Sequence, residues 1–488
     1  MIVVAWAAAA RGIGAVIILP GPGHTIVALW SEMTDVGFYG HLIATVIRTM
    51  VGFALAFVVG LVWGLLSGSS TAAGAVLVPT LVLIRSTPVI AIILLALIWF
   101  RASLAPVFVT WLMVVPVVVE NVTAGTRAAS GSLREMATVY RVPRSRRIRE
   151  LTLPALRPYL FASAHAGLGM AYKVTVAAEV IVQPRNALGG AMQEARFYLD
   201  TPRILALTLA VIAVSALTEW LLRAMERVAP GLLRGPGDDS PATEEMPGLT
   251  ARDAKAARTA PVVVSRVSRS YGPHTVLSGL SVTFEPGEIT VVLGPSGCGK
   301  TTMLRLIAGL DEPESGSIAA PAHRSLVFQE PRLLPWADAA ANIDFVLPRR
   351  NAARIRESLR LASLPAHGAT FPAALSGGMQ QRLSLARAFA HGGETILLDE
   401  PFQNLDLVVK LNLARQVRAT TAGNVTIMVT HDVVEALATA DRILIMAGSP
   451  ARIVGEERVG LKQEERDPRS AAHQAHAARL YDLLLSAR

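Results

Sequence analysis

Long apolar segments dominate the first 230 residues of this 488-residue chain. A helix needs about 20 mostly apolar residues to cross a bilayer. The pattern predicts such spans in six segments: 2–19, 43–66, 74–99, 104–123, 160–182 and 204–222. Arg11 and two glycines interrupt segment 2–19, and a signal peptide is the alternative there, although a basic start before the apolar core is missing. We therefore expect an all-α polytopic membrane domain of about six helices over residues 1–230.

The pattern changes after this domain. Residues 231–260 are rich in glycine and proline, mix acidic with basic residues and contain few apolar ones, which is typical of a linker. Residues 261–488 alternate short apolar runs with helical stretches. This alternation predicts an α/β nucleotide-binding domain, here a P-loop NTPase with a C-terminal helical tail.

Charge separates the two halves as well. The net charge is +9, and residues 1–230 carry 18 Lys and Arg against 10 Asp and Glu, whereas the remainder carries 28 against 27. The basic excess therefore lies in the membrane half, where arginines face anionic lipid headgroups, and nucleic-acid binding is not expected. Cys298 is the only cysteine, which excludes an intrachain disulfide.

Arginines also predict the orientation. Segment 125–158 contains eight of them, and such a dense basic loop is expected to stay in the cytoplasm. Counting six spans outward from this loop places the N-terminus inside and segment 183–203 outside. The C-terminal half then lies in the cytoplasm, where ATP is available, so the chain is expected to be a multi-pass protein of the cytoplasmic membrane.

The sequence GPSGCGKT forms a phosphate-binding loop. An apolar run over 288–293 precedes it and a helical stretch over 302–310 follows, which is the strand–loop–helix context that such a loop requires. Glycines let successive backbone N–H groups point at phosphate oxygens. Lys300 should reach the β- and γ-phosphates of ATP, and the Thr301 hydroxyl should bind Mg²⁺. The expected nucleotide-binding residues of this loop are Gly294, Pro295, Ser296, Gly297, Cys298, Gly299, Lys300, Thr301 and Thr302.

Four further residues have the character of a catalytic centre. The strand-like run ILLDE ends in Asp399, which would hold Mg²⁺ through water, and Glu400, which would polarise the attacking water. Gln329 follows another apolar run and would contact Mg²⁺ or the lytic water; alone it would be read as a surface glutamine. His431 follows a third run and would hydrogen-bond the γ-phosphate; alone it would be a capping or core histidine. The order and spacing of these motifs carry the inference.

At LSGGMQQR, from Leu375, the sequence resembles the ATP-binding cassette (ABC) superfamily. The resemblance implies that Tyr271 stacks on adenine and that Gln329 is the Q-loop residue. It also implies that Ser376, Gly377 and Gly378 grip the γ-phosphate of ATP bound to the opposite subunit. Because one chain has one phosphate loop and one signature loop, a working protein must pair two cassettes, most simply as a homodimer around two ATP molecules. Asp406 corresponds to the D-loop aspartate of the family.

The segment from Glu135 to Pro154 resembles the EAA loop of ABC importer permeases, a cytoplasmic helix–turn–helix that docks on the ATPase. Glu135, Ala137, Leu153 and Pro154 match that pattern, whereas Arg141 replaces the usual glycine, which leaves the geometry of the turn open. Exporters typically lack this loop, so the resemblance favours import. The alternative is a basic loop that only sets topology.

Further segments resemble the nitrate/sulfonate/taurine importer branch. They are LPGPGHTIVALW, GFYGHLIATVIRTMVGFALA, STP at 86–88, AAEVIV followed by Leu188-Gly189-Gly190, and VFQEPRLLPW. The branch implies import of a small organic anion with a separate extracytoplasmic solute-binding protein, and it also includes importers of thiamine-precursor pyrimidines. An ABC exporter, or an ABC ATPase that acts on DNA or ribosomes, remains an alternative from another class.

Two ionisable residues lie in the apolar segment 160–182. Such groups are costly in a membrane and usually face a cavity or a partner. Lys173 either attracts an anion such as a sulfonate, pairs with Glu179, or extends to an interface. His165 is similarly ambiguous, and the sequence leaves these alternatives open.

Overall fold

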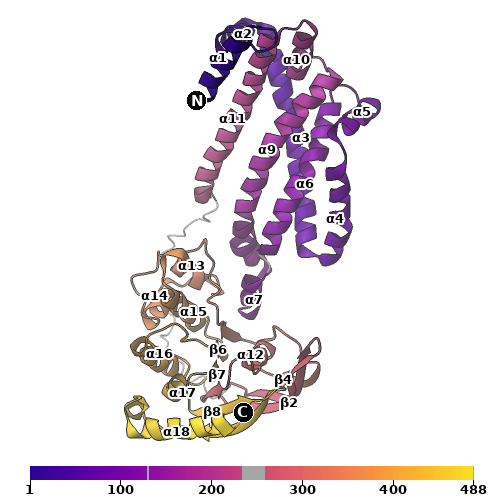
Figure 1. Cartoon of the computed structure of the whole chain (residues 1–488). Helices are drawn as coiled ribbons and strands as arrows, with labels where there is room; N and C mark the ends of the chain where they lie inside the picture. The colour runs from indigo at the N-terminus through magenta and orange to yellow at the C-terminus, as the bar shows by residue number, and fades with distance from the viewer. Residues whose placement is uncertain (129–130, 233–258, 487–488) are drawn as a thin grey trace. The chain divides into compact units, whose positions relative to one another are not determined.

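The computed structural model describes residues 1–128, 131–232 and 259–486, and the chain divides into two compact units (Figure 1). Residues 1–130 and 155–239 form the first, here called the helical unit. Residues 131–154 and 240–488 form the second, here called the α/β unit. The arginine-rich loop 131–154 therefore belongs with the C-terminal half. The expected linker 231–260 lies outside the described residues except for two residues at each end.

The helical unit contains nine described helices (Figure 1). Three of them, α3, α6 and residues 201–227 of α11, are long and apolar enough to cross a membrane. Helix α9 contains the expected span 160–182 but is not one of these three. The bounds are α1 Ile2–Ile13, α2 Pro22–Thr34, α3 Val36–Ser69, α4 Thr71–Ser86, α5 Val89–Trp99, α6 Ala105–Ala128, α9 Leu153–Val182, α10 Leu188–Phe197 and α11 Thr201–Leu232.

The expected span 74–99 is not one straight helix. It consists of α4 and α5, which meet at a bend of 96° and could together make a fourth span. The cause is Pro88, which has no N–H to donate and forces Thr87 into an extended conformation (φ −76°, ψ 128°). The prediction of a continuous helix was therefore wrong at residues 87–88.

The expected first span, 2–19, is wrong as well. Helix α1 has 12 residues, or about 18 Å at about 1.5 Å per residue, against a hydrocarbon core of about 30 Å. Gly14, at φ 68°, ends the helix in the left-handed conformation. The segment then lies against the start of α11, where the Thr201 hydroxyl donates to the Ile17 carbonyl. Arg203 also pairs there with Glu32 at 2.6 Å.

The N-terminal segment lies beside the segment that precedes α11. Residues 1–34 lie at the same end of the helical unit as segment 183–203, since Arg203 contacts both Glu32 and Glu194. The predicted cytoplasmic side of the N-terminus depended on a span at 2–19, which α1 is too short to make.

Glycines bring α3 and α6 into close contact. A Cβ atom added at Gly60 would lie 2.6 Å from the Val118 Cβ, and one added at Gly64 would lie 2.5 Å from the Val122 Cβ. Small residues allow this approach between membrane helices, where packing rather than the hydrophobic effect drives association. Helix α9 joins the pair through a hydrogen bond of 2.7 Å between the hydroxyls of Thr110 and Thr175.

A buried ion pair closes one end of the bundle. Arg48 of α3 donates to the Glu179 carboxylate of α9 at 2.7 Å, and the Thr45 hydroxyl donates to the same carboxylate at 2.8 Å. The Gly189 N–H at the start of α10 adds a third hydrogen bond of 3.2 Å. Glu179 thus has Arg48 as its ionic partner, and the alternative in which it pairs with Lys173 is wrong.

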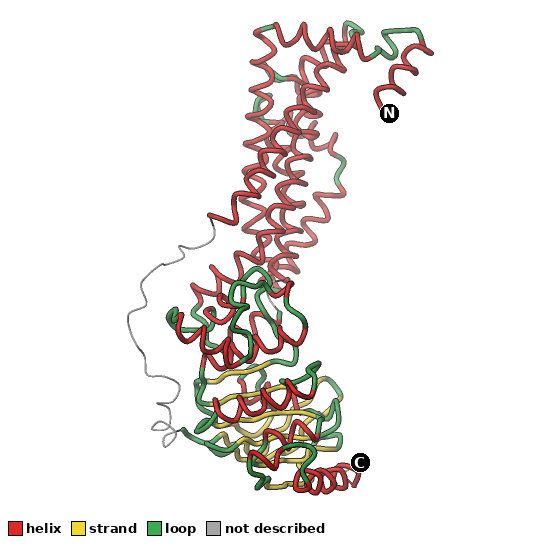
Figure 2. The backbone as a smooth tube through the Cα atoms, turned by 90° about the vertical axis from the view of Figure 1, so that its left-hand side faces the viewer, coloured by secondary structure: helices red, strands yellow, loops and turns green. Residues whose placement is uncertain are grey.

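The α/β unit contains the described strands (Figure 2). A three-stranded antiparallel sheet has the order β2-β1-β4, and a six-stranded sheet has the order β5-β6-β7-β3-β8-β9. All pairs in the second sheet are parallel except β8 with β9. The bounds are β1 Val262–Tyr271, β2 His274–Phe284, β3 Ile289–Leu293, β4 Ser315–Ala319, β5 Arg324–Val327, β6 Thr395–Asp399, β7 Val425–Thr430, β8 Arg442–Ala447 and β9 Arg452–Arg458.

Helices connect these strands, as expected for parallel pairing. The arginine-rich loop adds α7, α8 and a short π-helix, and the chain ends in the predicted helical tail, α18. The bounds are α7 Ser132–Val139, α8 Arg144–Arg146, the π-helix Arg147–Thr152, α12 Lys300–Ala308, α13 Ala339–Asp344, α14 Ala352–Leu361, α15 Gly377–His391, α16 Leu407–Thr420, α17 Val433–Thr439 and α18 Ala471–Ser486.

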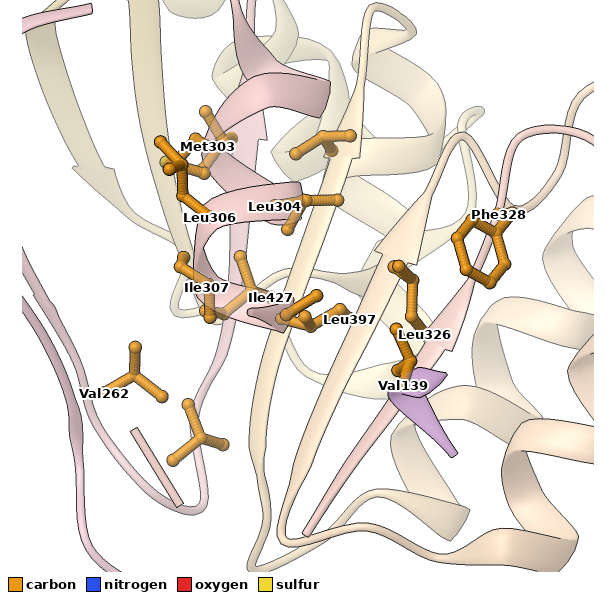
Figure 3. Close-up of a cluster of buried hydrophobic side chains, with 14 of the residues drawn as sticks. Val139, Val262, Met303, Leu304, Leu306, Ile307, Leu326, Phe328, Leu397 and Ile427 are labelled. Atoms are coloured by element: carbon orange, nitrogen blue, oxygen red, sulfur yellow. The ribbon is translucent and has the colours of Figure 1, made fainter. Parts of the chain in front are cut away.

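The arginine-rich loop shares a hydrophobic core with the rest of the α/β unit. Figure 3 shows Val139 of α7 beside Leu326 of β5, in a cluster that includes Leu304 of α12. Met136, Ala137, Tyr140, Val142 and Leu151 of the loop are buried in the same cluster. At about 25 cal/mol per Å² of apolar surface, this burial is the main attraction that holds the loop in place.

Candidate functional site

The phosphate-binding loop joins β3 to α12, as the sequence predicted. Gly297 and Gly299 have φ of 80° and 104°, a region that glycine enters without strain. The Lys300 ammonium lies inside the loop and donates to the carbonyl oxygens of Gly294 and Pro295, each at 2.8 Å. Gly294 itself must lack a side chain, because an added Cβ would lie 2.2 Å from the Met446 carbonyl oxygen.

Asp399 ends β6 beside this loop. Its carboxylate is 5% exposed and accepts a hydrogen bond of 3.1 Å from the Thr301 hydroxyl. Burial raises the pKa of Asp399 to about 6, because the charged form loses its hydration; the Thr301 hydrogen bond acts in the opposite direction. Burial therefore makes the ionised carboxylate costly, and a bound cation would offset that cost.

The oxygens of Thr301 and Asp399 fit a magnesium site. Mg²⁺ prefers oxygen ligands and usually keeps waters and substrate phosphates in its shell, so one or two protein oxygens are enough. No group of three or more His, Cys, Asp or Glu that could hold a metal occurs among the described residues. This donor set therefore suits a metal that arrives with a nucleotide.

Glu400 and His431 face each other at the carboxyl ends of β6 and β7. The His431 Nδ1 lies 3.1 Å from the Glu400 Oε1. The Glu400 backbone has φ of 45° and is held there by a hydrogen bond of 3.0 Å from its N–H to the Val429 carbonyl oxygen. A non-glycine residue in this conformation costs about 1–3 kcal/mol and is often found at functional sites.

Ten of the predicted residues line one open pocket. Val276 and Gln403 line it too, and the sequence analysis did not single them out. The predicted residues are Tyr271, Ser296, Gly297, Gly299, Lys300, Thr301, Thr302, Gln329, Glu400 and His431. Gly294, Pro295, Cys298 and Asp399 are not in this lining. The Cys298 thiol points instead toward the Met446 carbonyl oxygen at 3.6 Å, and the cysteine is free, as expected.

The signature residues lie outside this pocket. Ser376 caps α15, with its hydroxyl accepting a hydrogen bond of 3.3 Å from the Met379 N–H. A Cβ added at Gly377 would meet nothing within 4 Å, so this glycine borders open space. Gly378 instead packs close to Leu405, whose Cδ2 would lie 2.8 Å from an added Cβ. The structure of one chain therefore does not bring Ser376, Gly377 and Gly378 to its own phosphate loop.

Tyr271 is held at the rim of the pocket by neighbouring charges. Its hydroxyl donates to the Asp311 carboxylate at 2.9 Å, and the Arg269 guanidinium lies over its ring at 4.9 Å. Asp311 also pairs with Arg305 at 2.8 Å, which keeps the pKa of this carboxyl below its usual value. The ring is 43% exposed and can still offer a face to a base.

The arginine-rich loop meets the α/β core through Glu135. Its carboxylate accepts hydrogen bonds from Arg305 of α12 at 3.1 and 3.0 Å and from Arg332 at 2.7 Å. These contacts, with Arg305 first, lower the pKa of Glu135. Arg305 is five residues after Lys300, and Arg332 is three residues after Gln329. One carboxylate of the loop therefore contacts both segments that carry predicted nucleotide-binding residues.

Tyr140 forms a second, buried contact of the loop. Its hydroxyl donates to the Leu326 carbonyl oxygen at 2.9 Å, and burial raises the pKa of this tyrosine. Arg387 of α15 lies 5.6 Å from the Tyr140 ring centre and donates to the carbonyl oxygens of Pro331 and Arg332, each at 2.8 Å. The signature helix α15 is thus tied to the segment after Gln329.

The second half of the loop, α8 and the π-helix, is fixed by polar bonds. Arg146 pairs with Asp344 at 2.8 Å and donates to the Leu347 carbonyl oxygen at 2.6 Å. The Trp336 indole donates to the Glu150 carbonyl oxygen at 3.0 Å. Both ends of the loop are therefore bonded to the α/β core.

Arg141 keeps the turn for which the resemblance implied glycine. It has φ of 51°, the left-handed conformation that follows the end of α7. The Val142 N–H bonds back to the Ala137 carbonyl oxygen at 3.0 Å, and the Arg141 N–H bonds to that of Thr138 at 3.0 Å. The geometry of this turn, which the sequence left open, is therefore that of a helix end. The backbone of Arg141 is strained in this turn.

Several residues of this interface were missed by the sequence analysis. Arg305, Asp311, Arg332, Tyr140 and Arg387 are joined across separations of up to 247 residues, and no local spacing marks such pairs. The resemblance of the loop did indicate a docking element. It could not identify the residues of the core that receive it.

Family models match both halves of the chain. Residues 277–403 match the model described as ABC transporter. Residues 26–228 match the model described as binding-protein-dependent transport system inner membrane component. The two matches occur in the order of the expected membrane and nucleotide-binding domains.

Several relatives are import ATP-binding proteins. The chain is 45% identical over 214 residues to the Fe(3+) ions import ATP-binding protein FbpC 2 of Rhodococcus jostii, which is 40% of this chain and 62% of that protein. It is 40% identical over 230 residues to the aliphatic sulfonates import ATP-binding protein SsuB of Granulibacter bethesdensis, which is 46% of this chain and 95% of that protein. The chain therefore spans less than two thirds of the iron-import relative and nearly all of the sulfonate-import relative.

Solved cassettes are similar too. The dimeric structure of a post-hydrolysis state of the ATP-binding cassette MJ0796 bound to ADP and Pi aligns at a TM-score of 0.38 with 26% identity, and covers 41% of this chain and 100% of that chain.

Proposed function

Because this chain belongs to the ABC transporter family, with a permease component and an ATP-binding cassette in one polypeptide, we propose that it is an ATP-driven importer. The single observation that carries this proposal is the position of Glu135. This carboxylate of the arginine-rich loop lies between Arg305 and Arg332, which flank the phosphate loop and Gln329. A loop that only set membrane topology would need no such contacts.

We assign ATP hydrolysis to the pocket between the phosphate loop and Glu400. Lys300 and the N–H groups of residues 294–302 hold the phosphates, and Tyr271 stacks on adenine. The Thr301 and Asp399 oxygens would hold Mg²⁺, which would supply positive charge next to the phosphates. Glu400 accepts a proton from the attacking water, and the His431 imidazole, 3.1 Å away, orients this carboxylate and reaches the γ-phosphate.

We further propose that two copies of the chain act together. Ser376, Gly377 and Gly378 lie outside the pocket of their own chain, and Gly377 borders open space. The free N–H groups at the start of α15 suit a phosphate that a second copy presents. The importer would then be a homodimer with two ATP molecules at its interface, inserted in the cytoplasmic membrane with its ATPase half in the cytoplasm.

The cargo we favour is a small organic anion of the nitrate, sulfonate or taurine type. The near full-length likeness to an aliphatic sulfonates import ATP-binding protein supports this class. The permease match, whose description names binding-protein-dependent transport, supports delivery by a separate extracytoplasmic solute-binding protein.

The test uses the full chain in proteoliposomes with an alkanesulfonate-binding protein enclosed and ethanesulfonate as the probe. ATP hydrolysis is measured with and without the loaded binding protein, and with Glu400→Gln as the inactive control. Stimulation by the loaded binding protein is expected. Stimulation by lipid or a hydrophobic drug alone, with no response to any binding protein, would contradict import.

A further inference from the structure

Lys173 places a positive charge well inside an apolar helix. It lies 20 residues after Leu153 and nine before Val182 in α9, or about 30 Å and 14 Å along the axis at about 1.5 Å per residue. Lysines near the ends of membrane helices extend to the interface, whereas a central one must face a cavity or a partner. Its position therefore argues against the interface alternative.

This charge has no partner among the residues that the structure describes. Lys173 is exposed and has no hydrogen bond or ion pair within the described ranges. Glu179, the nearest acid in α9, is fully buried and bound by Arg48, Thr45 and Gly189. The acids that face His165, Glu219 and Glu226, belong to α11 and lie two turns further along α9. None of the described residues therefore supplies a counter-charge for Lys173.

The face of α9 around Lys173 differs from a lipid-facing surface. Its exposed residues between 160 and 180 are Ala162, Ala166, Lys173 and Ala177. At about 100° per residue these four lie within about 60° of one another around the helix. No large hydrophobic residue is exposed between Leu153 and Ile181 among the described positions.

Helix α3 provides the contrast. It exposes a row of large aliphatic side chains, as expected for contact with lipid tails: Ile43, Ile47, Val51, Leu55, Val58 and Val62. Gly169, between Ala166 and Lys173, has nothing within 4 Å of an added Cβ, so the α9 face is open rather than filled. A narrow, open face of small residues around one unpaired cation suits water and a small solute better than lipid.

We propose that this face of α9 borders the transport path and that Lys173 is the counter-charge that draws an anionic solute into it. The inference rests on the proposed function and names the substrate class that the membrane half selects. The ligand is a small anion, such as a sulfonate or carboxylate, that passes the Lys173 ammonium in water.

The test measures the electrostatic effect of Lys173 on a nearby cysteine and does not require transport. In full-length protein in proteoliposomes, Ala177→Cys lies one turn from Lys173 and is treated with 2-sulfonatoethyl methanethiosulfonate or its trimethylammonium counterpart. Peptide mapping separates this label from that on native Cys298. The anionic reagent is expected to react faster than the cationic one. Lys173→Gln should lower the ratio of the anionic to the cationic reaction rate roughly tenfold. This is the effect expected in water from a unit charge about 6 Å away on two reagents that differ by two charges.

Matched variants complete the design. Lys173→Arg should keep the ratio, and Leu55→Cys on the aliphatic face of α3 should react with neither reagent. A ratio that Lys173→Gln leaves unchanged would overturn the proposal. So would absence of both labels at Ala177→Cys together with an oxidative cross-link between two copies, because that result would mean a sealed contact. Since labelling needs no ATP, cargo or binding protein, its failure is distinct from a failure of binding-protein stimulation, which would overturn the importer itself.

Discussion

The guanidinium of Arg305 and the carboxylate of Glu135 form a paired contact with nitrogen–oxygen distances of 3.1 and 3.0 Å. Arg305 lies one and a half turns along the helix that begins at Lys300, so the pair joins the arginine-rich loop to the element that holds the phosphate loop. The same arginine pairs with Asp311, which holds the Tyr271 hydroxyl. A displacement of the loop is therefore expected to move both the helix that begins at Lys300 and the contact that holds Tyr271.

Replacing Glu135 should weaken coupling more than nucleotide binding. Glu135→Gln removes the charge that Arg305 and Arg332 share, which we expect to weaken loop docking by about 1–2 kcal/mol, since both pairs are partly exposed. ATPase stimulation by the loaded binding protein should fall several-fold while ATP affinity stays nearly constant. Glu357→Gln, which breaks a surface pair with Arg360 on α14, is the matched control and should change neither quantity. Equal effects of the two variants would remove Glu135 from coupling.

Asp399 should make the nucleotide-free protein less stable at high pH. Its folded-state pKa is raised to about 6 from 3.8, so its favourable contribution is fully present below pH 3.8 and is lost as the pH rises through about 6. A shift of about two units corresponds to about 3 kcal/mol. Asp399→Asn should therefore raise the melting temperature at pH 8 in EDTA and flatten the dependence on pH between about 4 and 6.

Magnesium and ATP provide the control for this prediction. Adding both at pH 8 should raise the melting temperature of the parent protein far more than that of the Asp399→Asn variant. The reason is that the variant lacks the carboxylate that would hold the metal. If the variant melts no higher than the parent at pH 8 in EDTA, the buried carboxylate is not the cause of the pH dependence.

Ten of the residues that local patterns singled out line one pocket, and each belongs to a short motif beside a strand or a helix. Lys300 and Thr301 meet Asp399 as expected, since parallel strands β3 and β6 end at the same edge of the sheet. The contacts of Glu135 and Tyr140 could not be predicted in this way. Their partners are arginines and carbonyls 170 or more residues away, and their pairing depends on how the loop packs.

The membrane half was predicted less well, and hydropathy is the reason. An average over about 20 residues does not register Gly14 or Pro88, although the left-handed glycine and the proline each stop a helix. Lys173 and Glu179 were paired by their proximity in sequence as one alternative, but Arg48 from another helix binds the glutamate. Partners across helices follow from packing, which a single sequence does not contain.

Glu400 is expected to be needed for hydrolysis and not for binding. Glu400→Gln keeps the size and the backbone position of the residue but cannot accept a proton, so ATP turnover should fall by about 10² to 10⁴. Binding of a fluorescent ATP analogue should remain within a few-fold of the parent. Glu394→Gln, an exposed acid before the other end of β6, is the control and should hydrolyse ATP normally. Undiminished turnover in Glu400→Gln would assign the base to another residue.

Arg141 should be replaceable by the residue that its backbone favours. At φ 51° an arginine carries about 1–2 kcal/mol of strain that glycine avoids, although glycine also gains freedom when unfolded. We expect Arg141→Gly to raise the unfolding free energy by up to about 1 kcal/mol, measured by thermal unfolding of the full chain in detergent. Arg144→Gly removes the same charge three residues later, at the start of α8, and should lower stability instead. If both variants lowered the unfolding free energy by similar amounts, the loss of charge rather than the backbone conformation would explain the effect at Arg141.

Two glycines of α3 should respond to alanine in opposite directions. At Gly64 an added Cβ would lie 2.5 Å from the Val122 Cβ and 2.7 Å from its Cγ1, so α3 and α6 must separate to admit it. We expect Gly64→Ala to lower the unfolding free energy by about 1–3 kcal/mol. At Gly40, on the same helix, an added Cβ meets nothing within 4 Å, and Gly40→Ala should raise it by up to about 1 kcal/mol through helix propensity. Thermal unfolding in one detergent measures both, and equal shifts would mean that α3 and α6 are not in close contact at Val122.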